Sequence, residues 1–265
     1  MLEVTQLHKY YGSFHAVKGI SFAVEKGEIV GFLGPNGAGK TTTMKIITGF
    51  MSMSSGNVAV NGFDVNHESL QVRSQIGYLP ENAPLYEDMT VTEYLSFMAN
   101  MRHLRGAQRR ERLEYAIGVC GLESKRRSVI RTLSKGFRQR TGLAQAIIHR
   151  PRLVILDEPT VGLDPNQIIG IRELLREVGE DNTVILSSDI LSEVEATCSR
   201  VMIINDGHVV ANGTPSELQV EHGGEGLEDT FIKLTRSADV EAQVVPDVEQ
   251  EEEAVERSDA DGEES

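Results

Sequence analysis

The stretch GPNGAGKTT, at residues 34–42, decides the fold of this chain. It fits the pattern G-x-x-x-x-G-K-[ST] and follows directly on EIVGFL, at 28–33, an apolar run that predicts a buried strand. Its three glycines let backbone amides curve around an anion, and a helix starting behind them turns its positive end toward phosphate. The stretch therefore predicts a strand, a phosphate-binding loop and a helix in that order.

The types of side chain in this loop indicate a nucleotide with a magnesium ion. Lys40 is expected to reach the β- and γ-phosphates of ATP, and the Thr41 hydroxyl to ligate Mg²⁺. A glycine-rich turn without a nucleotide is the alternative, but every fixed position of the pattern is present. The residues expected to contact ATP from this loop are Gly34, Pro35, Asn36, Gly37, Ala38, Gly39, Lys40, Thr41 and Thr42.

A second motif places two carboxylates at the end of an apolar strand, in RLVILDEPT at 152–160. In P-loop NTPases an Asp at this place holds the Mg²⁺ shell, which assigns that role to Asp157. Glu158 is then placed to polarise a water for attack on the γ-phosphate, as a general base or an orienting group. Acidic strand ends are common, so this assignment depends on the glycine loop.

The order of short apolar runs predicts an α/β protein. Strand-like runs open the chain at 2–7, 20–24 and 28–34, and between about 88 and 150 they give way to apolar residues at helical spacing. Further strand-like runs lie at 57–62, 75–80, 152–158, 182–188, 200–206 and 208–213. We expect a P-loop NTPase core with a β-rich N-terminal part and an inserted all-helical subdomain.

Charge is distributed unevenly. Residues 239–265 hold 12 acidic residues and one base, a net charge of −11, while the other 28 acidic and 25 basic residues give −3. So acidic a segment is typical of a solvated, disordered tail, with an arm for a basic partner as the alternative. The arginines from Arg102 to Arg131 lack interleaved aromatic residues and indicate a solvated helical face rather than a nucleic-acid surface.

Other features of the composition favour a cytoplasmic chain. Cys120 and Cys198 stand far apart and suggest neither a disulfide nor a zinc site. No apolar run approaches the roughly 20 residues of a membrane span, and the start MLEVTQLHKY has no signal-peptide core. We therefore expect a soluble chain.

One more motif makes the resemblance specific. LSKGFRQR, at 133–140 and here called the signature segment, precedes a helical run at 142–151 and the strand that carries Asp157. With these motifs, residues 1 to about 220 resemble the ATP-binding subunit of ABC transporters. In that family the signature segment contacts the γ-phosphate of ATP bound to the other subunit. The resemblance therefore implies a head-to-tail dimer in which Ser134 and Gly136 contact ATP, although Ser134 read alone is simply a helix N-cap.

Further landmarks of the family occur in order. Tyr11, in KYYGSFHAV, matches the aromatic residue that stacks on adenine, with Tyr10 as the alternative. VGLDP, at 161–165 and here called the D-loop, places Asp164 at the dimer interface. IGYLPE ends in Glu81, where the family usually has a Gln that links Mg²⁺ to the helical subdomain and touches the membrane partner.

The sequence departs from the wider family at three places. Lys135 and Phe137 stand where Gly and Gln are preferred, and Glu81 replaces Gln. These two departures, in the signature segment and at Glu81, resemble variants found in ABC-2 type exporters of the gliding-motility, copper-processing and multidrug kinds. The third departure is Asp189, in ILSSDILSEVE, at the position of a His that donates a hydrogen bond to the γ-phosphate.

An ionised Asp189 can only accept hydrogen bonds, so we expect slower hydrolysis. Two alternatives stay open. The γ-phosphate could raise the pKa of Asp189 until the carboxyl donates, or Asp189 could cap the following helix and turn away. The intact Glu158 argues against an abandoned site, and we predict that Glu158 and Asp189 are the catalytic pair.

The resemblance implies an ATP-hydrolysing exporter subunit that works with a separate membrane permease. It is expected at the inner face of the cell membrane, as a homodimer or paired with a related ATPase, and without nucleic acid. An ATP-gated regulatory module with little hydrolysis is the rival function, and a soluble ABC protein acting on ribosomes or DNA is a third. We expect a short C-terminal helix within 221–238, followed by the acidic tail.

Overall fold

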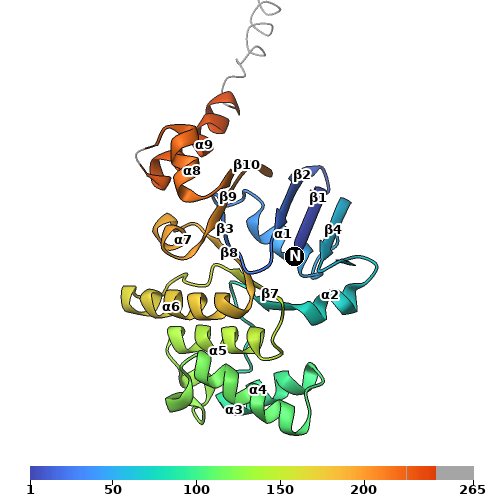
Figure 1. Ribbon diagram of the computed structural model, residues 1–265, viewed down its shortest axis with the longest axis vertical. Helices are drawn as coiled ribbons and strands as arrows, with labels where there is room; N and C mark the ends of the chain where they lie inside the picture. The colour runs from blue at the N-terminus through green and yellow to red at the C-terminus, as the bar shows by residue number, and fades with distance from the viewer. Residues whose placement is uncertain (225, 243–265) are drawn as a thin grey trace, which may run out of the picture.

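The computed structural model describes residues 1–224 and 226–242 and has two sheets with helices packed around them (Figure 1). The larger sheet has the order β10-β9-β3-β8-β7-β6, and all its neighbours are parallel except β9 and β10. Its strands are β3 (Ile29–Leu33), β6 (Ile76–Leu79), β7 (Leu153–Asp157), β8 (Thr183–Ser188), β9 (Arg200–Asn205) and β10 (His208–Gly213). The structure confirms the expected α/β fold.

The smaller sheet is antiparallel and forms the N-terminal part of the protein, in the order β2-β1-β4-β5. Its strands are β1 (Leu2–Tyr11), β2 (Phe14–Val24), β4 (Ser55–Val60) and β5 (Phe63–Asp64). β1 and β2 are longer than the sequence predicted, because Gly12 adopts φ 59° and closes a tight hairpin in which Tyr11 pairs with Phe14. This hairpin brings Tyr11 to the nucleotide loop.

Residues 88–150 form helices joined by turns, and no named strand occurs in that range. α3 (Val91–Met101), α4 (Gly106–Val119) and α5 (Lys135–Ile147) lie at the end of the molecule remote from α8 and α9 (Figure 1). Two 3-10 turns, Glu123–Lys125 and Ile130–Thr132, join α4 to α5. α5 starts before the predicted 142–151 because Ser134 caps its first turn.

The remaining helices connect the strands and follow the last of them. They are α1 (Lys40–Ile47), α2 (Ser69–Gln75), α6 (Pro165–Asp181), α7 (Leu191–Thr197), α8 (Pro215–His222) and α9 (Leu227–Ala242). The short C-terminal helix expected within 221–238 corresponds to α9, which continues to Ala242 and is preceded by α8. The rest of the predicted acidic tail, 243–265, lies outside the described residues.

Two apolar cores hold these layers together. Successive residues of β7 point to opposite faces, so Leu156 joins the core beneath α3–α6 and Ile155 joins the core between the two sheets. Phe32 of β3 and Met44 of α1 fill the second core. None of the helices in the described part of the chain has the length and apolar run that spanning a bilayer requires.

Gly77, in β6, allows α5 to approach the sheet at backbone distance. A Cβ at this position would overlap the backbone carbonyl oxygen of Ala146. We expect Gly77→Ala to lower the free energy of unfolding by about 1–3 kcal/mol, because a rigid backbone group must move. Chemical denaturation measures this.

Gly118→Ala is the matched control, because Gly118 is exposed in α4 and a Cβ there would extend into open space. Alanine favours a helix over glycine, so this variant should gain about 0.5–1 kcal/mol. Equal effects of the two substitutions would contradict the close approach at Gly77.

Candidate active site

Most of the residues that the sequence singled out for the nucleotide meet at one cavity of about 430 Å³. It lies at the carboxyl ends of β3, β7 and β8, the edge at which ligands bind in parallel α/β sheets. Its lining residues are Tyr11, Phe14, Ala16, Pro35, Asn36, Gly37, Gly39, Lys40, Thr41, Thr42, Glu81, Glu158, Val161 and Asp189.

The glycine loop closes tightly around this cavity. Gly39 sits at φ 107°, and a Cβ there would lie 2.9 Å from the Ala16 carbonyl oxygen, so only glycine fits. Lys40 is buried, and its Nζ donates to the Gly34 carbonyl at 2.6 Å. The ammonium is thereby held over the loop, 3.7 Å from Glu158 Oε1, where it can contact a β- or γ-phosphate.

Asp157 and Thr41 form the part of the site that suits Mg²⁺. Asp157 is buried, and its Oδ1 accepts hydrogen bonds from Thr41 Oγ1 at 3.2 Å and from Ser187 Oγ at 2.6 Å. The described residues contain no cluster of three His, Cys, Asp or Glu side chains that could hold a metal alone. One hydroxyl and one carboxylate beside a phosphate cradle fit Mg²⁺, which keeps waters and binds substrate phosphates.

Glu158 lies in a strained but well-held position. It adopts φ 50°, unusual for a residue with a side chain, and its amide donates to Ser187 Oγ at 3.0 Å and to the Ser187 carbonyl at 3.2 Å. Its Oε2 is buried and makes no hydrogen bond to another described residue, so this oxygen can accept one from a bound molecule. Ser187, which no sequence motif indicated, therefore holds both Asp157 and Glu158.

Burial and the neighbouring carboxylate of Asp189 raise the pKa of Glu158 to about 7. Asp157 also raises it, whereas the Lys40 ammonium and the Asp189 backbone amide lower it. A carboxyl that titrates near neutral pH is well matched to accept a proton from water.

Asp189 faces the cavity and does not cap the following helix. Ile190 is the N-cap of α7, and the helix has no side-chain cap. Ser188 Oγ accepts the hydrogen bond from the Ile190 amide at 3.0 Å and so takes the local role expected of Asp189. The capping alternative was therefore wrong, and Asp189 stays exposed beside Glu158.

The two tyrosines of the β1–β2 hairpin differ in position. Tyr11 lines the cavity, and its hydroxyl lies 3.0 Å from Met51 Sδ and 3.4 Å from Thr42 Oγ1. Tyr10 instead stacks on His15, with ring centroids 3.9 Å apart. The geometry favours Tyr11 for the adenine base. It also adds Phe14, the strand partner of Tyr11, which the hairpin register could have revealed.

Comparison with known proteins decides the family. The family model described as "ABC transporter" matches residues 17–161, more than half of the chain. The chain belongs to the ABC transporter ATP-binding family. It is accordingly an ABC ATPase that binds ATP with Mg²⁺.

Relatives agree with this assignment. The linearmycin resistance ATP-binding protein LnrL of Bacillus subtilis (strain 168) is 39% identical over 246 residues, 92% of this chain and 78% of that protein. A solved ATP-binding subunit of an ABC transporter is 33% identical, with a TM-score of 0.80, over 88% of this chain and 99% of that one. The dimeric structure of the bacterial ABC transporter cassette MJ0796 is 25% identical, with a TM-score of 0.73, over 81% of this chain and 98% of that one.

Five expected nucleotide contacts of this ABC domain do not line the cavity: Gly34 and Ala38 of the glycine loop, and Ser134, Gly136 and Asp164. Ser134 caps α5 and accepts from the Phe137 amide at 3.5 Å, and Asp164 caps α6 and accepts from the Gln167 amide at 3.0 Å. Gly136 is buried against the Gln167 side chain. Within one copy of the chain, Ser134, Asp164 and Gly136 are structural caps and packing positions.

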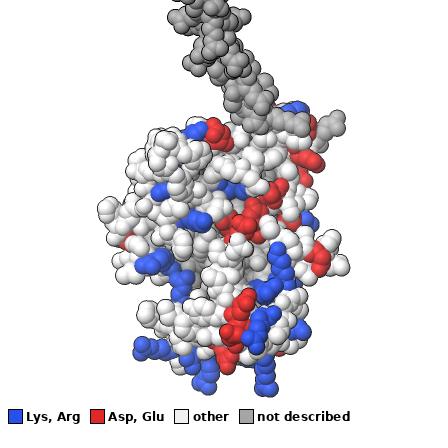
Figure 2. All heavy atoms as spheres, turned by 180° about the vertical axis from the view of Figure 1, so that it is seen from behind, with Lys and Arg blue, Asp and Glu red and all other residues white. Residues whose placement is uncertain are grey.

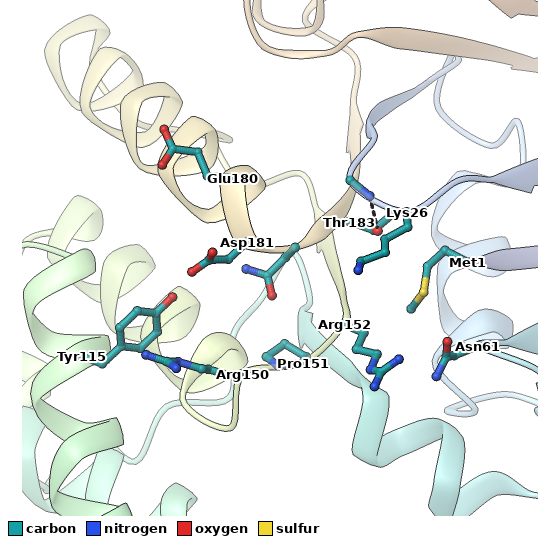
Figure 3. A pocket seen from close by; sticks show the side chains of 12 residues that line it. Met1, Lys26, Asn61, Tyr115, Arg150, Pro151, Arg152, Glu180, Asp181 and Thr183 are labelled. Carbon is teal, nitrogen blue, oxygen red and sulfur yellow. Dashed lines mark hydrogen bonds between the residues drawn. The ribbon is translucent and has the colours of Figure 1, made fainter.

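Another cavity, of about 590 Å³, lies at the opposite, amino-terminal edge of the larger sheet (Figure 3). Lys26 and Arg152 point into it, and Arg150 stacks on Tyr115 with its guanidinium carbon 4.7 Å from the ring centroid. None of the residues singled out for ATP or Mg²⁺ lines it. The sequence-predicted ATP site therefore coincides with the smaller cavity and not with this one.

Charged side chains of the helical region alternate in sign. Figure 2 shows acidic and basic side chains next to one another at the lower end of the face it draws. The ion pairs of this region include Arg126 with Glu114, Arg131 with Asp88 and Arg138 with Glu87. This mixture fits the solvated helical face that the sequence indicated.

Proposed function

We propose that this chain is the ATP-driven motor subunit of an ABC-2 type exporter. The observation that carries the proposal is one cavity shared by Lys40, Thr41 and Glu158, with Asp157 directly behind it. LnrL, whose name assigns it to linearmycin resistance, supports an export role. A separate membrane permease would carry the substrate, and this subunit would sit at its cytoplasmic face.

Two copies are proposed to bind head to tail around two ATP molecules. In a single copy, Val161 and Asp189 line the cavity and remain exposed. Ser134, Gly136 and Asp164 lie elsewhere on the same chain, so they can contact a nucleotide only across an interface. The dimeric structure of the MJ0796 cassette supports this arrangement.

Hydrolysis is proposed to depend on the residues around Glu158. When bound, Mg²⁺ supplies charge neutralisation of the phosphates, and Thr41 and Asp157 are the residues that would hold it, with Glu81 at the rim. Glu158 orients the attacking water and takes up its proton, while Lys40 contacts the phosphates. Tyr11 stacks on the adenine.

The rival function is an ATP-gated module that closes on ATP and hydrolyses it slowly. The position of Asp189 favours it, because this exposed carboxylate points into the cavity where a γ-phosphate would lie. Both functions share the ATP-dependent dimer and differ in turnover.

Analytical ultracentrifugation of the Glu158→Gln protein tests the dimer. We expect a dimer with Mg-ATP and a monomer with Mg-ADP, because the γ-phosphate completes the interface. Ser134→Arg should remain monomeric while it still binds ATP, since Ser134 lies outside its own cavity. A monomer under all conditions, with ATP bound, would rule out the homodimer.

A further inference from the structure

Two residues carry opposite charges that the single chain does not neutralise. Among the described residues, no ion pair within 4.0 Å involves Lys135 or Asp189. Both are exposed, and both are positions at which the sequence departs from the wider ABC family. The surroundings of each residue show whether its charge stabilises the single chain.

Lys135 stands where a positive charge is unfavourable. It is the first residue of α5, directly after the Ser134 cap, and the first turn contains no acidic residue. Amides at a helix N-terminus already carry partial positive charge, so a lysine there destabilises the helix. Its Nζ lies against Gly162 of the D-loop, since a Cβ on that glycine would overlap it.

Asp189 is also unfavourable in the monomer. It lines the same cavity as Glu158, so two carboxylates lie together at one site. The buried ammonium of Lys40 lies 3.7 Å from Glu158 Oε1 and donates to the Gly34 and Pro35 carbonyls. Asp189 thus adds negative charge at the place where a γ-phosphate binds, without a cation of its own.

We propose that in the ATP-bound dimer the partner subunit's Lys135 faces Asp189 and neutralises it beside the γ-phosphate. The inference rests on the head-to-tail dimer proposed above. It deepens that proposal by making each active site incomplete until the partner supplies a cation.

The positions of the D-loop and the signature segment support this pairing. Val161, at the start of the D-loop, lines the ATP cavity, and Lys135 lies on the next residue, Gly162. The signature segment therefore contacts the D-loop next to the residue that lines the cavity. In the proposed head-to-tail dimer, the exposed face of the signature segment meets the partner's cavity, where Asp189 is exposed.

The chemistry of lysine suits the task. An ammonium on a flexible four-carbon stem carries three donors, whereas an ionised Asp189 carries none. The partner's Lys135 can therefore donate to Asp189 and to a γ-phosphate oxygen together. This contact replaces the donor that the family's His supplies from within the same chain.

A double-mutant cycle in the Glu158→Gln protein tests the pair. Dimerisation with Mg-ATP is measured by ultracentrifugation for the parent, Lys135→Met, Asp189→Asn and the double variant. We expect Lys135→Met to weaken the dimer roughly tenfold or more, because it leaves Asp189 facing the phosphate unpaired. In the Lys135→Met protein, adding Asp189→Asn should strengthen the dimer, whereas in the parent it should weaken the dimer or leave it unchanged.

The controls separate this pair from general effects. Lys135→Arg keeps the charge and should keep the dimer, and Lys26→Ala removes a lysine at the opposite edge of the sheet (Figure 3). The melting temperature of monomeric Lys135→Met should not fall, because the helix N-terminus loses an unfavourable charge. ATP affinity of that monomer should also stay unchanged.

Two results would overturn the inference, and they are distinguishable. If the effects of Lys135→Met and Asp189→Asn simply add, the two residues do not meet, although the dimer stands. If the parent forms no dimer with Mg-ATP, the proposed dimer fails, and the pair fails with it.

Discussion

Glu158→Gln is expected to lower steady-state ATP turnover by roughly 10²-fold or more, the contribution typical of a positioned general base. Glutamine preserves the shape of the side chain but cannot accept a proton from water. The substituted residue keeps its two backbone hydrogen bonds to Ser187, so the local structure should remain. Phosphate release from the purified protein with Mg-ATP measures the effect.

ATP affinity should persist in Glu158→Gln, because Tyr11, Lys40 and Thr41 are unchanged. Glu173→Gln is the matched control, since Glu173 is an exposed carboxylate on α6 that does not line the cavity. It should leave turnover within a fewfold of the original. A Glu158→Gln protein that hydrolyses ATP as fast as the control would remove Glu158 from the reaction.

Local sequence predicted the phosphate loop well, because its glycines and Lys40 have fixed roles close together in the chain. The strand that carries Asp157 was also predictable, since a run of buried apolar residues ending in carboxylates has few alternatives. Both assignments depend on short-range geometry. The structure accordingly places the loop and Glu158 at one cavity, with Asp157 hydrogen-bonded to Thr41 of the loop.

Contacts between distant strands could not be predicted in the same way. Ser187 binds both Asp157 and Glu158 only because β7 and β8 are neighbours in parallel register, and a serine at a strand end carries no signal of its own. The orientation of Asp189 was left open for a similar reason. Ser188 competes for the same backbone amides, and only the structure shows which side chain turns back.

Asp189→His is expected to raise ATP turnover by at least roughly tenfold. The gain could reach roughly 10²–10³-fold, because this is the typical contribution of one hydrogen-bond donor to the transition state. Two like charges about 4 Å apart repel by about 1 kcal/mol in water and about 4 kcal/mol at an effective dielectric constant of 20. Asp189 opposes the γ-phosphate in this way, whereas a histidine donates to it. The expected gain therefore combines a removed repulsion with an added hydrogen bond.

Asp189→Asn separates these two causes, because it removes the charge without supplying the imidazole.

The pH profile gives a further test. Glu158 must be ionised to act as a base, so with a pKa of about 7 for this carboxyl the ATPase activity falls as the pH drops through about 7. Asp189 is one cause of that raised pKa, and its removal should shift the acidic limb of the kcat/KM profile to lower pH. Asp189→His should show the same shift with a higher plateau.

The comparison with Glu158→Gln decides between the two functions. If the unsubstituted protein turns over near the rate of Glu158→Gln and Asp189→His is much faster, Asp189 acts as a brake and the ATP-gated module gains. If the unsubstituted protein is already fast and histidine adds nothing, the carboxylate is tolerated. The partner subunit's Lys135 would then be sufficient to neutralise Asp189, and the chain would work as an ordinary transport motor.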